Sequence, residues 1–164
     1  MITGGDTGDV RGNLAFAVRE ITRSVGRIVR KSRVCESSAW GFESPRLFAN
    51  QVLVVETSLA PRAVLEALWK IEAAKGKDFH RYFDGRGRKI KSEKTKPGIV
   101  YASRALDIDI LFYDDLVMDD DYLTLPHPLI PVRRFVLEPL YEVMPHNIHP
   151  LLHKSVGELY ASSV

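Results

Sequence analysis

Residues 103–115 read SRALDIDILFYDD, a strand-like run of apolar residues that carries two aspartates, Asp107 and Asp109, in its middle. Aspartate is depleted in β-strands because its carboxylate packs poorly on a pleated surface and is unfavourable to bury without a partner. Side chains alternate between the two faces of a strand, so both aspartates are predicted to point to one face. The residues predicted to point the other way, into the core, are Leu106, Ile108, Ile110 and Phe112.

The two carboxylates of this strand are candidates for binding a divalent cation. Two strand rises of about 3.4 Å each separate their Cα atoms by roughly 7 Å. Carboxylates at that separation can converge on one or two hard cations, and oxygen ligands are what magnesium prefers. The alternative is a half-exposed strand whose polar face happens to hold two acids.

Cationic residues on both sides of this strand favour the metal site. Arg104 directly precedes it, and His127, Arg133 and Arg134 follow in a turn-rich segment. Carboxylates that hold a metal beside several cations are the groups needed to bind a polyphosphate and to offset charge during phosphoryl transfer.

A long basic segment precedes the same strand. Residues 75–96 contain nine Lys or Arg against three acidic residues, with no sustained periodicity. Loops of this length are uncommon inside a compact domain and often cover a site, although a solvated surface loop is an equal alternative.

Composition limits the class of protein. A chain of 164 residues with 45% hydrophobic content fits a single domain, residues 1–164, with a sizeable core. A formal net charge of +2 argues against a nucleic-acid partner. The lone Cys35 excludes an internal disulfide framework, and no signal peptide or apolar run of about 18 residues is visible. We therefore expect a soluble, cytoplasmic protein without a membrane partner, and a monomer.

The amino-terminal half predicts alternating helices and strands. A first helix has an apolar stripe of Leu14, Val18, Ile21 and Val25, with Asn13 off that stripe. Strands are predicted within residues 27–36 and 51–57.

A second amphipathic helix is predicted to begin near Pro61 and to end near Gly76. Its buried face consists of Val64, Leu65, Leu68 and Ile71.

Two further helices are predicted in the carboxyl-terminal part. Residues 135–143 form a short apolar helix, and the Ser155 and Glu158 spacing predicts a capping box at the start of a last helix. The order of elements indicates one α+β domain whose helices pack on a largely antiparallel sheet.

Several motifs, in the right order, carry a family resemblance. Residues 103–115, together with LTLPHPLIPVRRFVLEPLYEV at 123–143, closely resemble the signature region of the 6-hydroxymethyl-7,8-dihydropterin pyrophosphokinases. The similarity extends to ESSAWGFESPRLFANQVLVVETSLAP at 36–61 and to GGDTGDVRGNL at 4–14. These folate-pathway enzymes move the pyrophosphoryl group of ATP onto the pterin hydroxymethyl and release AMP. The resemblance implies a ferredoxin-like three-layer sandwich with helices on both faces of the sheet, ATP as co-substrate and two Mg²⁺ ions.

The resemblance also implies roles for individual residues of the phosphate site. Asp107 and Asp109 match the magnesium-binding aspartates of the family. Arg104 and Lys77 match cationic residues of its catalytic loop, where the lysine keeps the charge of the usual arginine but not its bidentate fork. His127 and Arg133 match residues that contact the ATP phosphates, and the alternative for each is an ordinary surface residue. The positions that line the nucleotide site are matched by Trp69, Glu72 and Thr124, and helix packing explains the first two equally well.

A second set of matches implies the pterin site. Phe48 and Phe135 align with the two aromatic positions between which the flat heterocycle stacks. Asn50 aligns with the side chain that reads the amide edge of the pterin. Backbone groups of residues 37–41 are expected to complete the pocket, and Trp40 marks this segment. Ordinary core packing is the alternative for the two phenylalanines.

Three departures from the family pattern concern the first strand and the loop. The first strand is shortened to Met-Ile-Thr, and Asp6 stands where the family commonly has asparagine. The loop between Glu72 and Arg104 is longer than usual and ends in VYASR instead of Trp-Gly-Pro-Arg.

Two other classes of function stay open. A small mixed domain with a basic loop could bind RNA or DNA, although that role would not require the aspartate pair. The altered loop could also mark a catalytically impaired relative that acts as an interaction module.

Overall fold

The computed structural model describes residues 1–38, 45–77 and 104–163, so Trp40 and most of the predicted basic loop lie outside the described residues. The main sheet has the strand order β2-β4-β1-β5, with β3 paired to β4, and every pairing is antiparallel. Its strands are β1 (Ile2–Gly5), β2 (Arg27–Lys31), β3 (Cys35–Ser37), β4 (Phe48–Glu56) and β5 (Asp107–Asp109). A separate two-stranded sheet pairs β6 (Met118–Asp119) with β7 (Thr124–Leu125).

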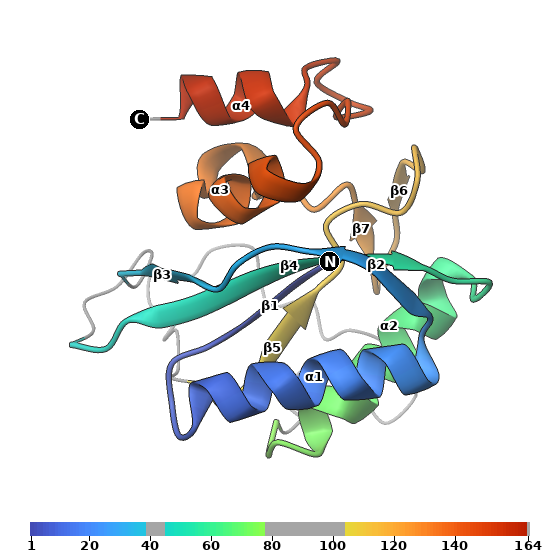
Figure 1. Cartoon of the computed structure of the whole chain (residues 1–164). Helices are drawn as coiled ribbons and strands as arrows, with labels where there is room; N and C mark the ends of the chain where they lie inside the picture. Colours follow the sequence, from blue (N-terminus) through green and yellow to red (C-terminus); the bar gives the residue numbers. More distant parts are fainter. Residues whose placement is uncertain (39–44, 78–103, 164) are drawn as a thin grey trace.

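Helices cover both faces of the main sheet (Figure 1). One face carries α1 (Val10–Ser24) and α2 (Pro61–Ala73), and the other carries α3 (Arg134–Val143), on which α4 (Val156–Ser162) packs from outside. A short 3-10 helix, η2 (Ile130–Val132), precedes α3. The predicted three-layer α+β sandwich with a largely antiparallel sheet is therefore confirmed.

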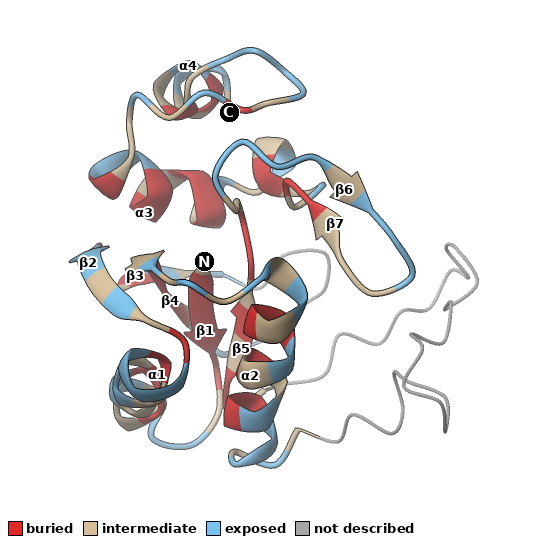
Figure 2. Cartoon of the chain, turned by 90° about the vertical axis from the view of Figure 1, so that its right-hand side faces the viewer, coloured by how far each residue is buried: buried red, intermediate tan, exposed pale blue. Residues whose placement is uncertain are grey.

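The sheet separates two apolar cores. In Figure 2, β1 is buried between α1 and α2 on one side and α3 on the other. The first core, here called the α1/α2 core, includes Leu14, Ile21, Leu53, Leu68, Leu106 and Ile108. The second, here called the α3 core, includes Ile2, Val52, Leu111, Ile130, Leu137 and Leu140.

The aspartate strand alternates as predicted but is shorter than expected. Leu106, Ile108 and Ile110 pack in the α1/α2 core, so the neighbouring aspartates face the α3 side. The prediction for Phe112 is wrong, because the chain leaves the sheet after Asp109 and alternation no longer applies. Phe112 packs against the α3 core and meets the ring of His149 edge-on, with the ring centroids 5.6 Å apart.

Helix α1 begins five residues after β1 ends and is followed by a segment that passes close to the end of β4. Asp9 caps its start by accepting a hydrogen bond from the Gly12 N–H at 2.9 Å. Gly26 follows its end, where a Cβ would lie 2.1 Å from the Glu56 carbonyl oxygen, so only glycine fits.

One residue of α1 does not lie where the sequence predicted. Asn13 is buried, and its Nδ2 donates a hydrogen bond to the Ala105 carbonyl at 3.0 Å. The error comes from overlooking that Asn13, Ala17 and Ile21 recur every four residues and share one helix face.

The ends of the other helices agree with the sequence. Pro61 is the first residue of α2, and Gly76 adopts a left-handed φ of 87° three residues after the helix ends. The capping box of α4 is present, because Ser155 Oγ accepts from the Glu158 N–H and the Glu158 carboxylate accepts from the Ser155 N–H. No helix among the described residues is long and apolar enough to cross a membrane.

His149 should make the fold sensitive to mild acid. Its Nδ1 accepts hydrogen bonds from the Leu151 and Leu152 N–H groups at 3.3 Å, and burial lowers its pKa below the ordinary 6.5. Below pH 6.5 the unfolded chain takes up a proton that the folded chain resists, so stability falls as the pH drops. We expect the Tm to fall between pH 7 and pH 5.5, measured by circular dichroism.

The variant His149→Asn keeps an acceptor near the position of Nδ1 and removes the titration, so it should flatten that pH dependence. The matched control, His146→Asn at an exposed position three residues earlier, should retain the wild-type dependence. An identical acid response in His149→Asn and the wild type would contradict the assignment.

Candidate active site

Three residues form one row across the sheet. In the registers of β1 with its two neighbours, Gly4 lies opposite Asn50 on one side and opposite Asp107 on the other. Directly opposed residues share a face, so the predicted pterin-reading amide and the predicted metal-binding carboxylate flank a residue that has no side chain. Two strand spacings of about 4.8 Å separate their backbones by roughly 10 Å.

Asn50 is held over Gly4. Its side chain is buried, and its Nδ2 donates to Ser37 Oγ at 3.3 Å. A Cβ at Gly4 would lie 2.4 Å from Asn50 Oδ1, closer than any real contact. The glycine therefore fixes where the amide can lie.

Asp107 is bonded by two cations. Lys77 Nζ lies 2.5 Å from its Oδ1, and Arg104 donates to its Oδ2 at 2.5 Å. Burial alone would raise the pKa of Asp107, but the charges of Lys77 and Arg104 outweigh burial and lower it to about 2. The carboxylate is therefore charged at any physiological pH.

Glu72, near the end of α2, supports this arrangement from beneath. Its side chain is 1% exposed, and its Oε1 accepts from Lys77 Nζ at 2.6 Å and from the Ile108 N–H at 2.8 Å. Burial raises the pKa of Glu72 to about 8, against the opposing effect of Lys77. Burial would also lower the pKa of Lys77, but Asp107 and Glu72 raise it, so the ammonium stays charged.

Asp109 lies in a different electrostatic setting from Asp107. Burial raises its pKa, and the nearby negative charge of Asp107 raises it further. His127, Lys77 and Arg133 act in the opposite direction on the pKa of Asp109, so these predicted phosphate-binding residues lie within its electrostatic reach. The structure thus brings five of the predicted site residues together around the two aspartates.

For the two remaining predicted nucleotide residues, Thr124 and Trp69, the structure shows contacts outside this cluster. Thr124, in β7, donates from its Oγ1 to Asp119 at 2.7 Å. Trp69 is half-buried on α2 and packs against the α1/α2 core. Neither contact selects between a structural role and nucleotide binding.

His127 is oriented by its own segment. Its backbone N–H donates to the Leu111 carbonyl at 2.9 Å, and its Nδ1 accepts from the Leu129 N–H at 3.2 Å. An accepting Nδ1 leaves the Nε2 atom to carry the proton of the neutral ring. The ring can therefore donate a hydrogen bond from Nε2.

The predicted pterin residues lie on the α3 side of the sheet. Phe48 and Asn50 share a face of β4 with Val52, which belongs to the α3 core. Phe135, in the first turn of α3, packs against the same core, with the Arg133 guanidinium 5.6 Å from its ring centroid. The fourth predicted pterin residue, Trp40, lies outside the described residues.

The donor set fits magnesium. Asp107 and Asp109 project carboxylate oxygens from one face of β5, and Asp107 is bonded by two cations. Hard oxygen donors on one face of a strand suit Mg²⁺. Within residues 1–38, 45–77 and 104–163, no group of three or more His, Cys, Asp or Glu could hold a metal by itself. Mg²⁺ in proteins is usually held by one or two carboxylates together with waters and substrate phosphates, so two aspartates are enough protein ligands for such a site.

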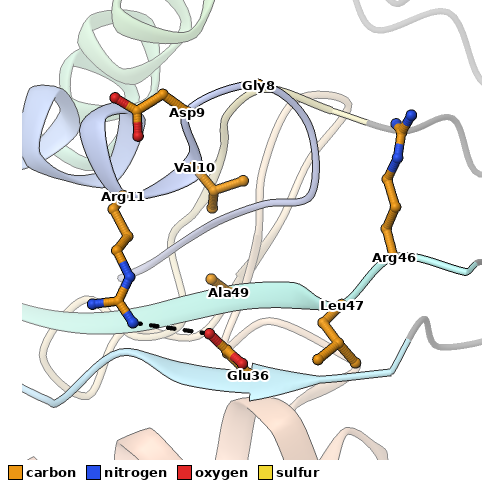
Figure 3. Close-up of a pocket in the computed structure, with 8 residues that line it drawn as sticks. All are labelled: Gly8, Asp9, Val10, Arg11, Glu36, Arg46, Leu47 and Ala49. Carbon is orange, nitrogen blue, oxygen red and sulfur yellow. Dashed lines mark ion pairs between the residues drawn. The ribbon is translucent and has the colours of Figure 1, made fainter.

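An open groove of about 490 Å³ lies elsewhere, at the amino end of α1 (Figure 3). Arg11 and Glu36 face each other across it, 4.0 Å apart, and both are exposed. Its wall includes Ala49, which belongs to the α1/α2 core and points away from the face of Phe48 and Asn50. None of the predicted site residues lines this groove, so it is separate from the aspartate cluster.

Comparison with known proteins identifies the family. The profile of the 7,8-dihydro-6-hydroxymethylpterin-pyrophosphokinase (HPPK) family matches residues 1–145. The chain belongs to the HPPK family. The resemblance predicted from the sequence motifs is therefore confirmed.

Curated relatives agree with the HPPK assignment. The chain is 34% identical to the 2-amino-4-hydroxy-6-hydroxymethyldihydropteridine pyrophosphokinase of Aquifex aeolicus, over 94% of this chain and 85% of that protein. It is also 34% identical to the protein of the same name from Porphyromonas gingivalis, over 90% of each.

A solved structure shows the same fold in a longer protein. The Plasmodium falciparum HPPK-DHPS structure matches with a TM-score of 0.65 at 15% identity. The match covers 98% of this chain and 42% of that one, so this chain spans less than half of the Plasmodium protein.

Sequence reasoning missed the roles of Gly4 and Asn13 near the HPPK site. Gly4 was noted only as part of a motif, although a glycine inside a strand indicates a close approach. Asn13, which holds the Ala105 carbonyl, shares the helical spacing of Ala17 and Ile21, and this spacing indicated burial. Ser37 was expected in the pterin pocket through its backbone, but the contact of its hydroxyl with Asn50 was not predicted.

The contact of Gly4 with Asn50 makes a prediction about stability. Gly4→Ala should destabilise the fold by about 1–3 kcal/mol in urea denaturation, because the added methyl collides with the buried amide. In an Asn50→Ala background the obstructing Oδ1 atom is gone, so the same Gly4→Ala change should be far less destabilising. Equal effects of Gly4→Ala in both backgrounds would show that the amide is not what Gly4 accommodates.

Proposed function

We propose that this chain transfers the pyrophosphoryl group of ATP to the hydroxymethyl group of 6-hydroxymethyl-7,8-dihydropterin and releases AMP, in folate biosynthesis. Membership of the HPPK family and the names of the curated relatives support this transferase activity and ATP as its co-substrate. The observation that carries it is the cluster in which Lys77 and Arg104 bond Asp107 beside Asp109. The same family membership favours the enzyme over a nucleic-acid-binding module, and the AMP assay below separates it from an impaired relative.

The cluster has the groups that a transferring pyrophosphoryl group requires. Lys77 and Arg104 now bond Asp107, and on nucleotide binding they would bond phosphate oxygens instead. The planar guanidinium of Arg104 suits bidentate contact with a phosphate. His127, through its Nε2, and Arg133 would donate to the same polyphosphate. Together these residues would hold ATP in line with the attacking hydroxyl and offset the charge on the departing AMP.

Asp107 and Asp109 would hold two Mg²⁺ ions. Ions held there would supply positive charge to offset the charge of the transferring group. Loss of the contacts that Asp107 makes with Lys77 and Arg104 would then free those cations for the nucleotide.

The pterin would bind on the α3 side of β4. Phe48 and Phe135 would stack on its two faces, and Asn50, held by Ser37, would read its amide edge. The row Asn50, Gly4 and Asp107 supports this placement, because it puts the pterin end and the metal end of one site on a single face. Trp69, Glu72 and Thr124 would line the nucleotide, and Trp40 would complete the pterin pocket.

The proposed enzyme acts as a monomer in the cytoplasm. Its proposed partners are ATP and the pterin alone, without nucleic acid or membrane.

The decisive measurement is AMP release. Purified protein with Mg²⁺, ATP and 6-hydroxymethyl-7,8-dihydropterin should form AMP at a rate that depends on the pterin, and excess EDTA should abolish it. AMP formed at the same rate without pterin, or no AMP at all from folded protein, would refute the proposal.

Asp109→Asn tests the metal role separately from the fold. Turnover should fall by at least about 100-fold, since electrostatic contributions of this kind are often of that size or larger. The Tm should hold or rise, because burial and Asp107 disfavour the charged form of Asp109. Asp115→Asn, at an exposed position of the same segment, is the control and should keep full turnover. Wild-type turnover in Asp109→Asn would rule out the metal assignment.

A further inference from the structure

Asp6, directly after β1, is bonded twice to the main chain of Arg104. The Arg104 N–H donates to Asp6 Oδ1 at 2.6 Å, and the Asp6 N–H donates to the Arg104 carbonyl oxygen at 2.9 Å. Both peptide groups that flank the Arg104 Cα are therefore fixed to the end of β1. The side chain of Asp6 is not a surface group, because the residue is only 5% exposed.

The second carboxylate oxygen of Asp6 stabilises nothing by hydrogen bonding in the described part of the chain. Its Oδ2 is buried and has no hydrogen-bond partner among the described residues. A buried polar atom without a partner destabilises a fold. The contribution of the Asp6 side chain to the structure therefore comes from Oδ1, which accepts the hydrogen bond from the Arg104 N–H.

Neighbouring residues hold the next peptide in the same way. Asn13 Nδ2 donates to the Ala105 carbonyl at 3.0 Å. A Cβ at Gly5 would lie 2.5 Å from that same carbonyl oxygen, so glycine permits the close approach of the two chains. The main chain of residues 104 and 105 is thus held by Asp6, directly after β1, and by Asn13 of α1, while the Arg104 side chain makes a separate contact.

The guanidinium of Arg104 donates to Asp107 Oδ2 at 2.5 Å. The position of Asp107 is set by its pairing with Gly4 of β1, two residues before Asp6 in the chain. We propose that Asp6 is a positioning residue for the reaction, which holds the main chain of Arg104 so that its guanidinium meets the phosphates beside Asp107. This inference rests on the proposed function and assigns to Asp6 the orientation of a cation in that same site.

The kinetic test compares two variants of Asp6. Asp6→Ala removes the acceptor, so kcat should fall about 10- to 100-fold with KM for ATP changed less than about 3-fold, as expected for a misplaced catalytic group. Asp6→Asn keeps a carbonyl oxygen at the Oδ1 position and should restore kcat to within about 3-fold of the wild type. If Asp6→Ala does not fold, Asp6→Ser takes its place, and it must show the same loss of kcat.

A double-mutant cycle separates positioning from general damage. In an Arg104→Ala background there is no guanidinium to position, so Asp6→Ala should lower kcat less than about 3-fold further. An equal loss in both backgrounds would overturn the proposal. Thr3→Val is the matched control, because Thr3 is buried on β1, three residues before Asp6, and donates to the Gln51 carbonyl instead. It should leave kcat unchanged.

Hydrogen exchange gives a readout that does not depend on activity. The Arg104 amide should exchange at least about 10-fold faster in Asp6→Ala than in the wild type or Asp6→Asn, because only Asp6→Ala lacks its acceptor. Unchanged exchange in Asp6→Ala would refute the positioning role whatever the assay shows. Wild-type protein that protects this amide but forms no AMP would instead refute the proposed reaction.

Discussion

The antiparallel pairing of β5 with β1 is the constraint on which the site depends. It puts Asp107 opposite Gly4 and Asp109 opposite Ile2, so both carboxylates lie on the α3 side while Ile108 packs beneath them. Because β1 also pairs with β4, the same strand sets Asn50 in line with Asp107. A shift of one residue in either register would turn these side chains to the opposite face.

The fold was largely predictable because its signals are local. Helical stripes such as Val64, Leu65 and Leu68, the Pro61 start and the Ser155 capping box each depend on residues a few positions apart. Phe112 was misplaced because period-two alternation holds only while the chain stays in the sheet. The layers and the ferredoxin-like topology came from the family resemblance, since periodicity alone does not fix strand order.

The site was predictable in its residue types but not in its contacts. The aspartate pair and Arg104 stand out because charged residues flank an apolar strand. Asp6 and Asn13 carry no such signal, because their bonds to residues 104 and 105 join segments about 90 positions apart. Contacts of this kind depend on the folded topology and not on any local pattern.

Glu72 also protects the edge of the main sheet from pairing with other chains. Among the described residues β5 is an edge strand of the main sheet, and its Ile108 N–H donates to the Glu72 carboxyl. An open donor at such a margin invites a strand from another chain, which is a route to aggregation. The same carboxyl that steadies Lys77 therefore helps to keep separate copies of the protein from joining edge to edge.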